Sequence, residues 1–109
     1  MCGLEFPDLE ASVYQPYKDQ DVIVVGINPG AMMMGGESAA RVRAFVDQTR
    51  VTFPVGFDDG DSYKMFPYGG AISPFPLDVI VDRDGTIVYA ERRYDGRAIR
   101  RAVADAVAR

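Results

Sequence analysis

Three stretches of the chain carry apolar side chains at the spacing of one helical face. The first, residues 4–18, predicts a helix that directs five side chains inward: Leu4, Phe6, Leu9, Val13 and Tyr17. Pro7 is tolerated in its first turns, whereas Pro16 is expected to fray or end it. The second helix is predicted from about residue 38 to 49, with Val42, Phe45 and Val46 directed inward. The third is predicted from residue 95 or 96 onward, and its inward side chains are Ile99, Ala102, Val103, Ala106 and Val107.

Strand patterns fill the intervals between these helices. Residues 21–27 are an almost unbroken run of Val and Ile, which is typical of a strand covered on both faces. Residues 53–55 predict a short extended segment. Residues 77–81 and 86–91 flank an Asp84-Gly85 pair and predict a β-hairpin, because Asp-Gly accommodates the positive φ of a tight turn. No repeat or linker interrupts this order, so residues 1–109 are expected to form a single α/β domain.

Composition excludes several classes of protein. The 109 residues are 48% hydrophobic and 26% charged, with a net charge of −4 from interleaved acids and bases, which argues against nucleic acid or an anionic membrane as the main partner. No apolar run is long enough to span a bilayer. As given, the chain is expected to be soluble and cytoplasmic, and an export signal upstream of Met1 stays open. Without histidine and with one cysteine, no metal and no cofactor are expected.

Two loops resemble ligand-binding motifs only in part. Residues 30–37 have the glycine spacing of a phosphate loop as far as Gly35, but Gly36 replaces the lysine and Glu37 replaces the hydroxyl residue. Residues 58–61 carry three aspartates without the glutamate of a calcium loop. A flexible loop and a solvated turn are therefore the better interpretations.

Cys2, the only cysteine, lies on the opening turn of the first predicted helix, and Glu5 follows one turn later. A thiolate at a helix N-terminus is stabilised by the unpaired N–H groups and the helix dipole, so Cys2 is a candidate redox residue. The alternatives are a bystander cysteine near a frayed terminus and, for Glu5, a favourable acid in a first helical turn.

Several segments, in order, resemble the thioredoxin-like superfamily. Cys2, Glu5 and Pro7 match the second cysteine, the acid and the proline of its active-site helix, which carries Cys-x-x-Cys, two residues, Glu, one residue and Pro. The strand ending at Asn28, the segment 53–55, the Pro-Phe-Pro of residues 74–76 and the Asp-Arg-Asp-Gly of residues 82–85 resemble later family segments. The AhpC/TSA (redoxin) branch and the thiol-disulfide oxidoreductases of the cytochrome-maturation type are the most similar.

The resemblance implies roles for four residues. Cys2 matches the resolving cysteine of the motif, and Glu5 matches the acid that tunes thiol protonation. Pro76 matches the proline whose cis peptide bond presents the backbone of Phe75 to an extended substrate. The alternative for Pro76 is an ordinary trans proline, since only about 5–6% of X–Pro bonds in folded proteins are cis.

The chain departs from the family at its beginning. The first central strand and the nucleophilic residue would both lie upstream of Met1, so the resemblance implies a three-layer thioredoxin-like fold that lacks this strand, with a mixed sheet and a C-terminal β-hairpin and helix. We expect a start inside a longer reading frame, with cysteine or selenocysteine upstream. The missing strand would lie between residues 22–27 and 77–81, which predicts direct closure of those strands or an intertwined homodimer.

Two functions follow from this resemblance. The first is a thiol-disulfide oxidoreductase or thiol peroxidase of the redoxin type, an antioxidant enzyme of cell redox homeostasis. It would act on protein or small-molecule disulfides or on peroxides with a thiol reductant, and the 109-residue chain as given is expected to be impaired or inactive. The alternative is a non-catalytic thioredoxin-like binding or assembly module.

Overall fold

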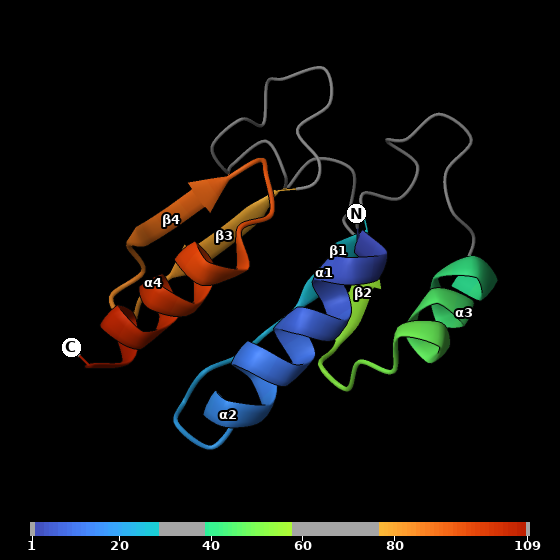
Figure 1. Ribbon diagram of the computed structural model, residues 1–109, viewed down its shortest axis with the longest axis horizontal. Helices are drawn as coiled ribbons and strands as arrows, with labels where there is room; N and C mark the ends of the chain where they lie inside the picture. Colours follow the sequence, from blue (N-terminus) through green and yellow to red (C-terminus); the bar gives the residue numbers. More distant parts are fainter. Residues whose placement is uncertain (1, 29–38, 58–76, 109) are drawn as a thin grey trace.

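Helices and strands follow one another in the order that the hydrophobic pattern predicts (Figure 1). The computed structural model describes residues 2–28, 39–57 and 77–108. The helical elements are α1 (Cys2–Leu9), the π-helical turn η1 (Glu10–Tyr14), α2 (Gln15–Tyr17), α3 (Ala39–Thr49) and α4 (Gly96–Ala108). The strands are β1 (Gly26–Asn28), β2 (Val55–Phe57), β3 (Asp78–Val81) and β4 (Ile87–Glu91). The predicted loops at residues 30–37 and 58–61 lie outside the described residues.

The N-terminal helix runs from α1 through η1 into α2 and ends beside Pro16, as predicted. Its inward row is Glu5, Leu9 and Val13, which are four residues apart and therefore stack on one face. The expectation that Leu4 points inward is wrong, because its side chain is 83% exposed. Leu4 precedes Glu5 by one position, about 100° around the helix, so burial of the 5-9-13 row turns Leu4 outward.

The strands form two separate pairs. β1 is parallel to β2, with Gly26 opposite Val55, and β3 is antiparallel to β4, with Asp78 opposite Glu91. The predicted hairpin is confirmed: Gly85 has φ 89° in the turn, which is the conformation that a glycine adopts without strain. The last helix is confirmed as well, with Ile99 and Val103 buried.

The strand predicted over residues 21–27 forms only from Gly26 onward, as β1, and the segment before it is covered on one face rather than on both. Ile23, Val25 and Ile27 are 84%, 52% and 60% exposed, whereas Val24 packs against the core. Successive side chains of an extended chain point to opposite faces, so one row turns away from the helices while the other contacts them. The expectation of two covered faces is therefore wrong. In the part of the chain that the structure describes, no ladder joins β1 to β3, so the two sheets do not close on each other directly.

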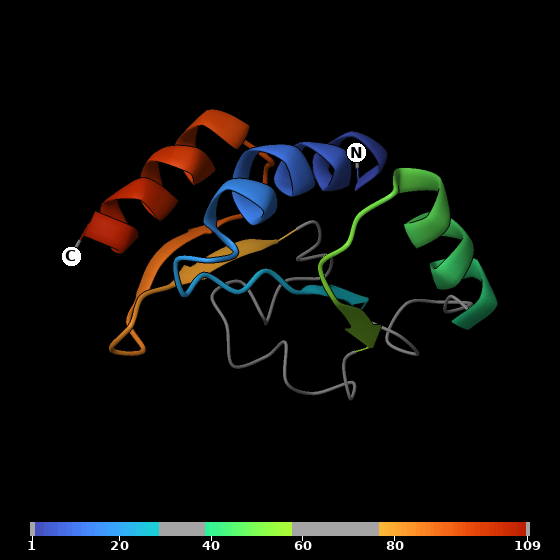
Figure 2. The ribbon, with the colours of Figure 1, turned by 90° about the horizontal axis from the view of Figure 1, so that it is seen from below.

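The main core lies between helices and strands. α1 and α4 run side by side over the strands (Figure 2). Val13 from the N-terminal helix meets Ile99 and Val103 from α4, and all three are buried. Partly buried side chains from both sheets and from the helices surround them: Leu9, Tyr17, Val24, Ile80, Tyr89, Tyr94 and Val107.

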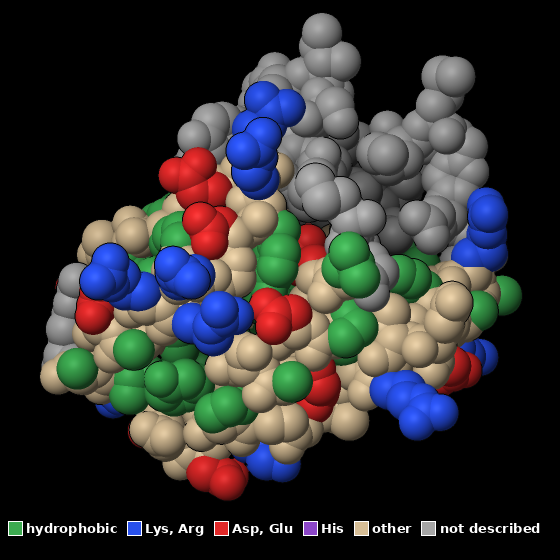
Figure 3. All heavy atoms as spheres, in the orientation of Figure 1, with side chains coloured by type: hydrophobic (Ala, Val, Ile, Leu, Met, Phe, Trp, Pro, Cys, Tyr) green, Lys and Arg blue, Asp and Glu red, His purple; other side chains and the backbone are tan. Residues whose placement is uncertain are grey.

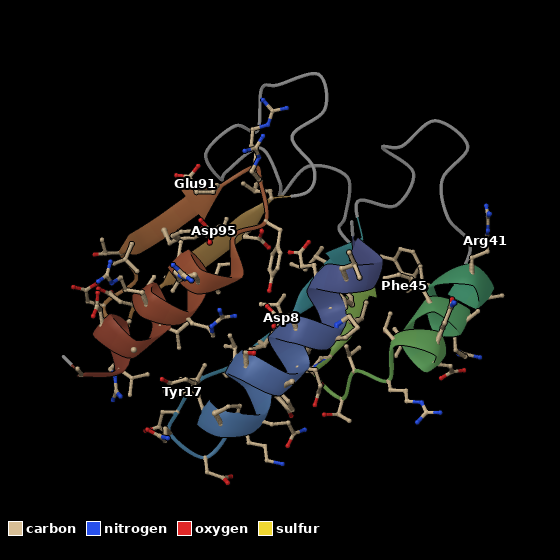
Figure 4. All side chains as sticks on the ribbon, in the orientation of Figure 1. Asp8, Tyr17, Arg41, Phe45, Glu91 and Asp95 are labelled. Atoms are coloured by element: carbon tan, nitrogen blue, oxygen red, sulfur yellow. The ribbon has the colours of Figure 1, made fainter. Side chains whose placement is uncertain are left out.

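An aromatic cluster forms a second core between α1, α3 and the segment that leads into β2. The ring of Phe6 lies 5.2 Å from Phe45 and 5.3 Å from Phe53, both in edge-on geometry, and Tyr14 lies 6.0 Å from Phe53. Phe45 reaches from α3 toward α1 (Figure 4). These contacts fix α1 above β1 and β2.

Gly26→Ala is expected to lower the free energy of unfolding by about 1–3 kcal/mol, the usual cost of overpacking a core. A Cβ atom at Gly26 would lie 3.0 Å from Cζ of Phe6 and 3.2 Å from Cγ2 of Val55. Urea unfolding followed by circular dichroism measures the change. The control is Gly56→Ala on the neighbouring strand, where an added Cβ meets nothing within 4 Å. Equal losses in the two variants would show that the approach of Phe6 does not require glycine.

Candidate functional site

The two N-terminal candidate residues, Cys2 and Glu5, share helix α1. α1 begins at Cys2, and Glu5 lies three residues later, within the first turn of the helix. The side chain of Cys2 lies outside the described part of the structure, as do Phe75 and Pro76. Of the predicted site residues, Glu5 is therefore the one whose surroundings can be examined.

Glu5 is buried to an extent that is unusual for a carboxyl group. Its side chain is 4% exposed, and it is a hydrogen-bond partner of the Asp78 side chain at the start of β3. Two carboxyl groups can hydrogen-bond to each other only when one of them carries a proton. A contact between Glu5 and Asp78 therefore requires a proton on one of the two carboxyl groups.

Several causes act on the pKa of Glu5. Burial raises it most, and the hydrogen bond and negative charge of Asp78 raise it further, while the positive amino terminus lowers it; together they bring the pKa of Glu5 from 4.5 to about 8. Glu5 is therefore largely protonated at neutral pH. A protonated carboxyl group one helical turn from a thiol can give a proton to a departing thiolate.

Asp78 is a member of the site that the sequence interpretation missed. Its Oδ2 atom is fully buried, and none of the described residues hydrogen-bonds to that atom as a conventional donor. A proton on Glu5 supplies the donor that a buried carboxyl oxygen requires. The available signal was a single acid within the otherwise apolar run of residues 77–81, two positions after Pro76.

Tyr89 lies on the same face of the hairpin as Asp78. Ile80 is opposite Tyr89 and Glu91 is opposite Asp78, so these four side chains share one face of the sheet. Burial raises the pKa of Tyr89, and the negative charges of Asp95, Asp78 and Glu91 raise it further. Its hydroxyl is also buried without a hydrogen bond to any described residue. The hydroxyl of Tyr89 on β4 is thus a second buried polar group on the face of the hairpin that carries Asp78.

A second set of polar contacts fixes α1 against α4. Asp8 points from α1 toward α4 (Figure 4) and accepts hydrogen bonds from Tyr94 and, at 3.3 Å, from Nη1 of Arg100. Ser12 donates to its other oxygen at 3.1 Å. Burial and then the hydrogen bond to Asp8 raise the pKa of Tyr94, so this hydroxyl stays protonated and keeps donating. These contacts hold the helix that carries Cys2 and Glu5.

Glu10 fixes the same helix to the segment before β2. The backbone N–H of Thr52 donates to Oε1 of Glu10 at 2.5 Å, and the Thr52 hydroxyl donates to Oε2 at 2.8 Å. Burial acts to raise the pKa of Glu10, but the hydrogen bonds from Gln15, Thr52 and Phe53 outweigh it, and the net pKa is lowered. The pKa values of Glu5 and Glu10 are thus shifted in opposite directions by their partners.

A cavity of about 590 Å³ lies along β4 and α4 and shares Tyr89 with the surroundings of Asp78. Its lining carries both signs of charge: Tyr89, Asp95, Arg97, Ala98, Arg101, Ala102 and Asp105. Figure 3 shows basic side chains over α4 with acidic ones among them. No residue of α1 lines this cavity, so it does not open onto Glu5.

No three acidic or cysteine side chains of residues 2–28, 39–57 and 77–108 come together as metal ligands. In the same ranges, no helix has the length and apolar character needed to cross a membrane.

Comparison with known proteins identifies the fold. No family model matches the chain, and no curated protein matches it. Among solved structures, the crystal structure of a Chlorobium tepidum protein described as the thiol:disulfide interchange protein DsbE is similar, with 21% sequence identity and a TM-score of 0.76. The match covers 97% of this chain and 70% of that chain. With its mixed α/β order and this similarity, the chain has a thioredoxin-like fold.

Proposed function

We propose that the chain is a thiol-disulfide oxidoreductase in which Cys2 is the resolving thiol and Glu5 is its proton donor and acceptor. The observation that carries this proposal is the burial of Glu5, at 4% exposure, one helical turn after Cys2. Burying an acid costs free energy, and groups with strongly shifted pKa values gather at functional sites. The thioredoxin-like fold and the motif around Cys2 support the same chemistry.

The proposed step is an exchange of one sulfur–sulfur bond for another. An incoming thiolate attacks the partner sulfur of a disulfide at Cys2 and forms a new disulfide with that partner. The bond to Sγ of Cys2 breaks, and Cys2 leaves as a thiolate. Cys2 then takes the proton from Glu5. In the reverse direction, Cys2 returns that proton to Glu5 as its sulfur attacks.

The proposed substrates are protein or small-molecule disulfides, with a thiol as reductant. The similar Chlorobium tepidum protein is described as a thiol:disulfide interchange protein, which favours disulfides over peroxides as the first substrates to test. A thiol peroxidase of the AhpC/TSA (redoxin) type is the finer alternative, and hydrogen peroxide is its probe. In either case we assign the backbone of Phe75 before Pro76 to substrate binding.

Incubation with excess glutathione disulfide is expected to add one glutathione per chain at Cys2. Intact-mass spectrometry measures the addition, and Cys2→Ser, which removes the only thiol, should add none. Added dithiothreitol should release the glutathione, because the chain has no second thiol to do so. A folded wild-type chain that stays unmodified after hours with the disulfide would overturn the proposed role of Cys2.

A second candidate function is a binding or assembly module without catalysis. The single cysteine favours it, since a lone thiol cannot complete an exchange within one chain. The two functions differ in turnover: an oxidoreductase supplied with a separate thiol should reduce a disulfide substrate many times per chain, whereas a binding module should not exceed the uncatalysed rate.

We further propose that the chain forms a homodimer through β1 and β3, whose facing edges carry no ladder between them. Ile27 on β1 and Val81 on β3 are 60% and 50% exposed, and unpaired strand edges with apolar side chains favour pairing with another chain. Light scattering after size exclusion should give twice the mass of one chain at micromolar concentration. Ile27→Lys should shift it to monomer, whereas Ala104→Lys on the exposed side of α4 should not. A wild-type monomer would exclude the dimer.

A further inference from the structure

The Oδ2 atom of Asp78 is buried although the residue as a whole is half-buried, and this calls for a separate explanation, since Glu5 alone resembles the acid of the family motif. Asp78 lies on β3, on the face of the hairpin that also carries Ile80 and Tyr89, both of which pack against the main core. That face is turned toward the helices. An acid at this position is directed into the protein, where an isolated carboxyl group is unfavourable.

The only described side chain that hydrogen-bonds to Asp78 is Glu5, itself an acid. No described lysine or arginine forms an ion pair with Asp78, and the buried Oδ2 atom has no conventional donor among the described residues. The arrangement is therefore satisfied by a proton held between the two carboxyl groups and by no other described group. Two acids that share a site keep such a proton, because both cannot ionise at close range.

We propose that Asp78 is a positioning residue that fixes the carboxyl group of Glu5 on the side of α1 that faces the hairpin. This inference rests on the proposed function for its consequence: Asp78 sets the pH above which Glu5 can no longer give a proton to Cys2. When the Cys2 thiolate takes the proton from Glu5, the two carboxylates are left facing each other. Their repulsion favours rapid return of a proton to Glu5, which resets the site.

The charged and titratable groups around this pair come from β4, the segment before α4 and the amino terminus. Glu91 is opposite Asp78 but exposed, so water screens its charge; Tyr89 lies diagonally across from Asp78 on β4, and Tyr94, just before α4, interacts electrostatically with Glu5. Asp95 acts on Tyr89. The amino terminus is the positive charge that acts on Glu5, and it opposes the acids. Most of the charges that surround the pair are thus negative and favour retention of the proton.

The test is Asp78→Asn, with two readouts that fail independently. The asparagine amide can donate to a Glu5 carboxylate and carries no charge, so it should lower the pH at which Glu5 ionises. In the wild type, the free energy of unfolding should fall as the pH rises and should level off at a midpoint that is set by the ionisation of Glu5. In Asp78→Asn that midpoint should move down by one pH unit or more, a tenfold or greater change in proton affinity. The pH profile of glutathione exchange at Cys2 should move in the same direction.

Glu91→Gln is the matched control, since Glu91 is opposite Asp78 in the ladder but exposed. Glu91→Gln should leave the pH midpoint of the unfolding free energy and that of exchange at Cys2 within a few tenths of a pH unit of the wild-type values. Should Asp78→Asn not fold, Asp78→Ser keeps a small polar side chain and should give the same direction of shift. An unmoved unfolding midpoint in the folded variant would overturn the role of Asp78. A moved midpoint without exchange at Cys2 would support the carboxyl pair and reject the proposed function.

Discussion

Raising the pH from about 5.5 to 9 is expected to destabilise the wild-type chain strongly, and Glu5→Gln is expected to remove most of that dependence. The pKa of Glu5 is about 8 in the folded chain, against 4.5 for an ordinary glutamate. The folded chain then binds more protons than the unfolded chain between these values. Stability is therefore fully present below pH 4.5 and is lost as the pH rises through about 8.

The size of this effect follows from the gap between the two pKa values. At about 1.4 kcal/mol per pKa unit, the part of this gap that lies above pH 5.5 corresponds to on the order of 3 kcal/mol. Glu10 acts in the opposite sense, because its lowered pKa gives stability that is lost as the pH falls through the acid range. Measurements above pH 5.5 therefore isolate Glu5.

Urea unfolding at a series of pH values measures this dependence. Glutamine keeps the shape of Glu5 and can donate to Asp78 at every pH, so the variant should be nearly flat above pH 5.5. Glu91→Gln, at an exposed position, should keep the wild-type slope. A slope that persists unchanged in Glu5→Gln would mean that another group carries the dependence.

Phe53→Ala is expected to lower the free energy of unfolding by about 3–5 kcal/mol, the range measured for buried aromatic truncations. Phe53 is 3% exposed, and its ring packs edge-on against Phe6 and Tyr14. Because small domains are stable by only about 5–15 kcal/mol, this loss should leave a measurable fraction unfolded at 37 °C. Removing the ring also frees the side of α1 that faces β2, so exchange at Cys2 should weaken together with stability.

The control for Phe53→Ala is Phe57→Ala, four residues later. Phe57 is 47% exposed at the end of β2, so its truncation should cost much less than that of Phe53. Urea midpoints of the two variants at the same pH give the comparison. Equal losses would show that the aromatic cluster does not hold α1 on β2.

The regular elements could be predicted because local chemistry determines them. Gly85 requires the positive φ of the hairpin turn, and the apolar stripe of α4 repeats at the helical period. Val42 on α3 is buried as that period predicts. In these segments the propensity, the periodicity and the turn residues all favour the same structure.

The site departs from that local consistency. Periodicity assigns the apolar Leu4 to the core, yet Leu4 is exposed and the acidic Glu5 beside it is buried. The partner that makes this burial tolerable, Asp78, is 73 positions away in the sequence, and no local pattern can reveal that the two acids meet. The exposed row at Ile23 and Val25 has the same origin, since the faces of a strand are covered by distant elements.

A carboxyl carbon NMR titration of the wild-type chain is the most informative next measurement. The signal of Glu5, assigned by its loss in Glu5→Gln, should titrate near pH 8. A Glu5 signal that titrates near its ordinary value of 4.5 would show that the acid is not held protonated against Asp78 and that the site described for Cys2 does not form.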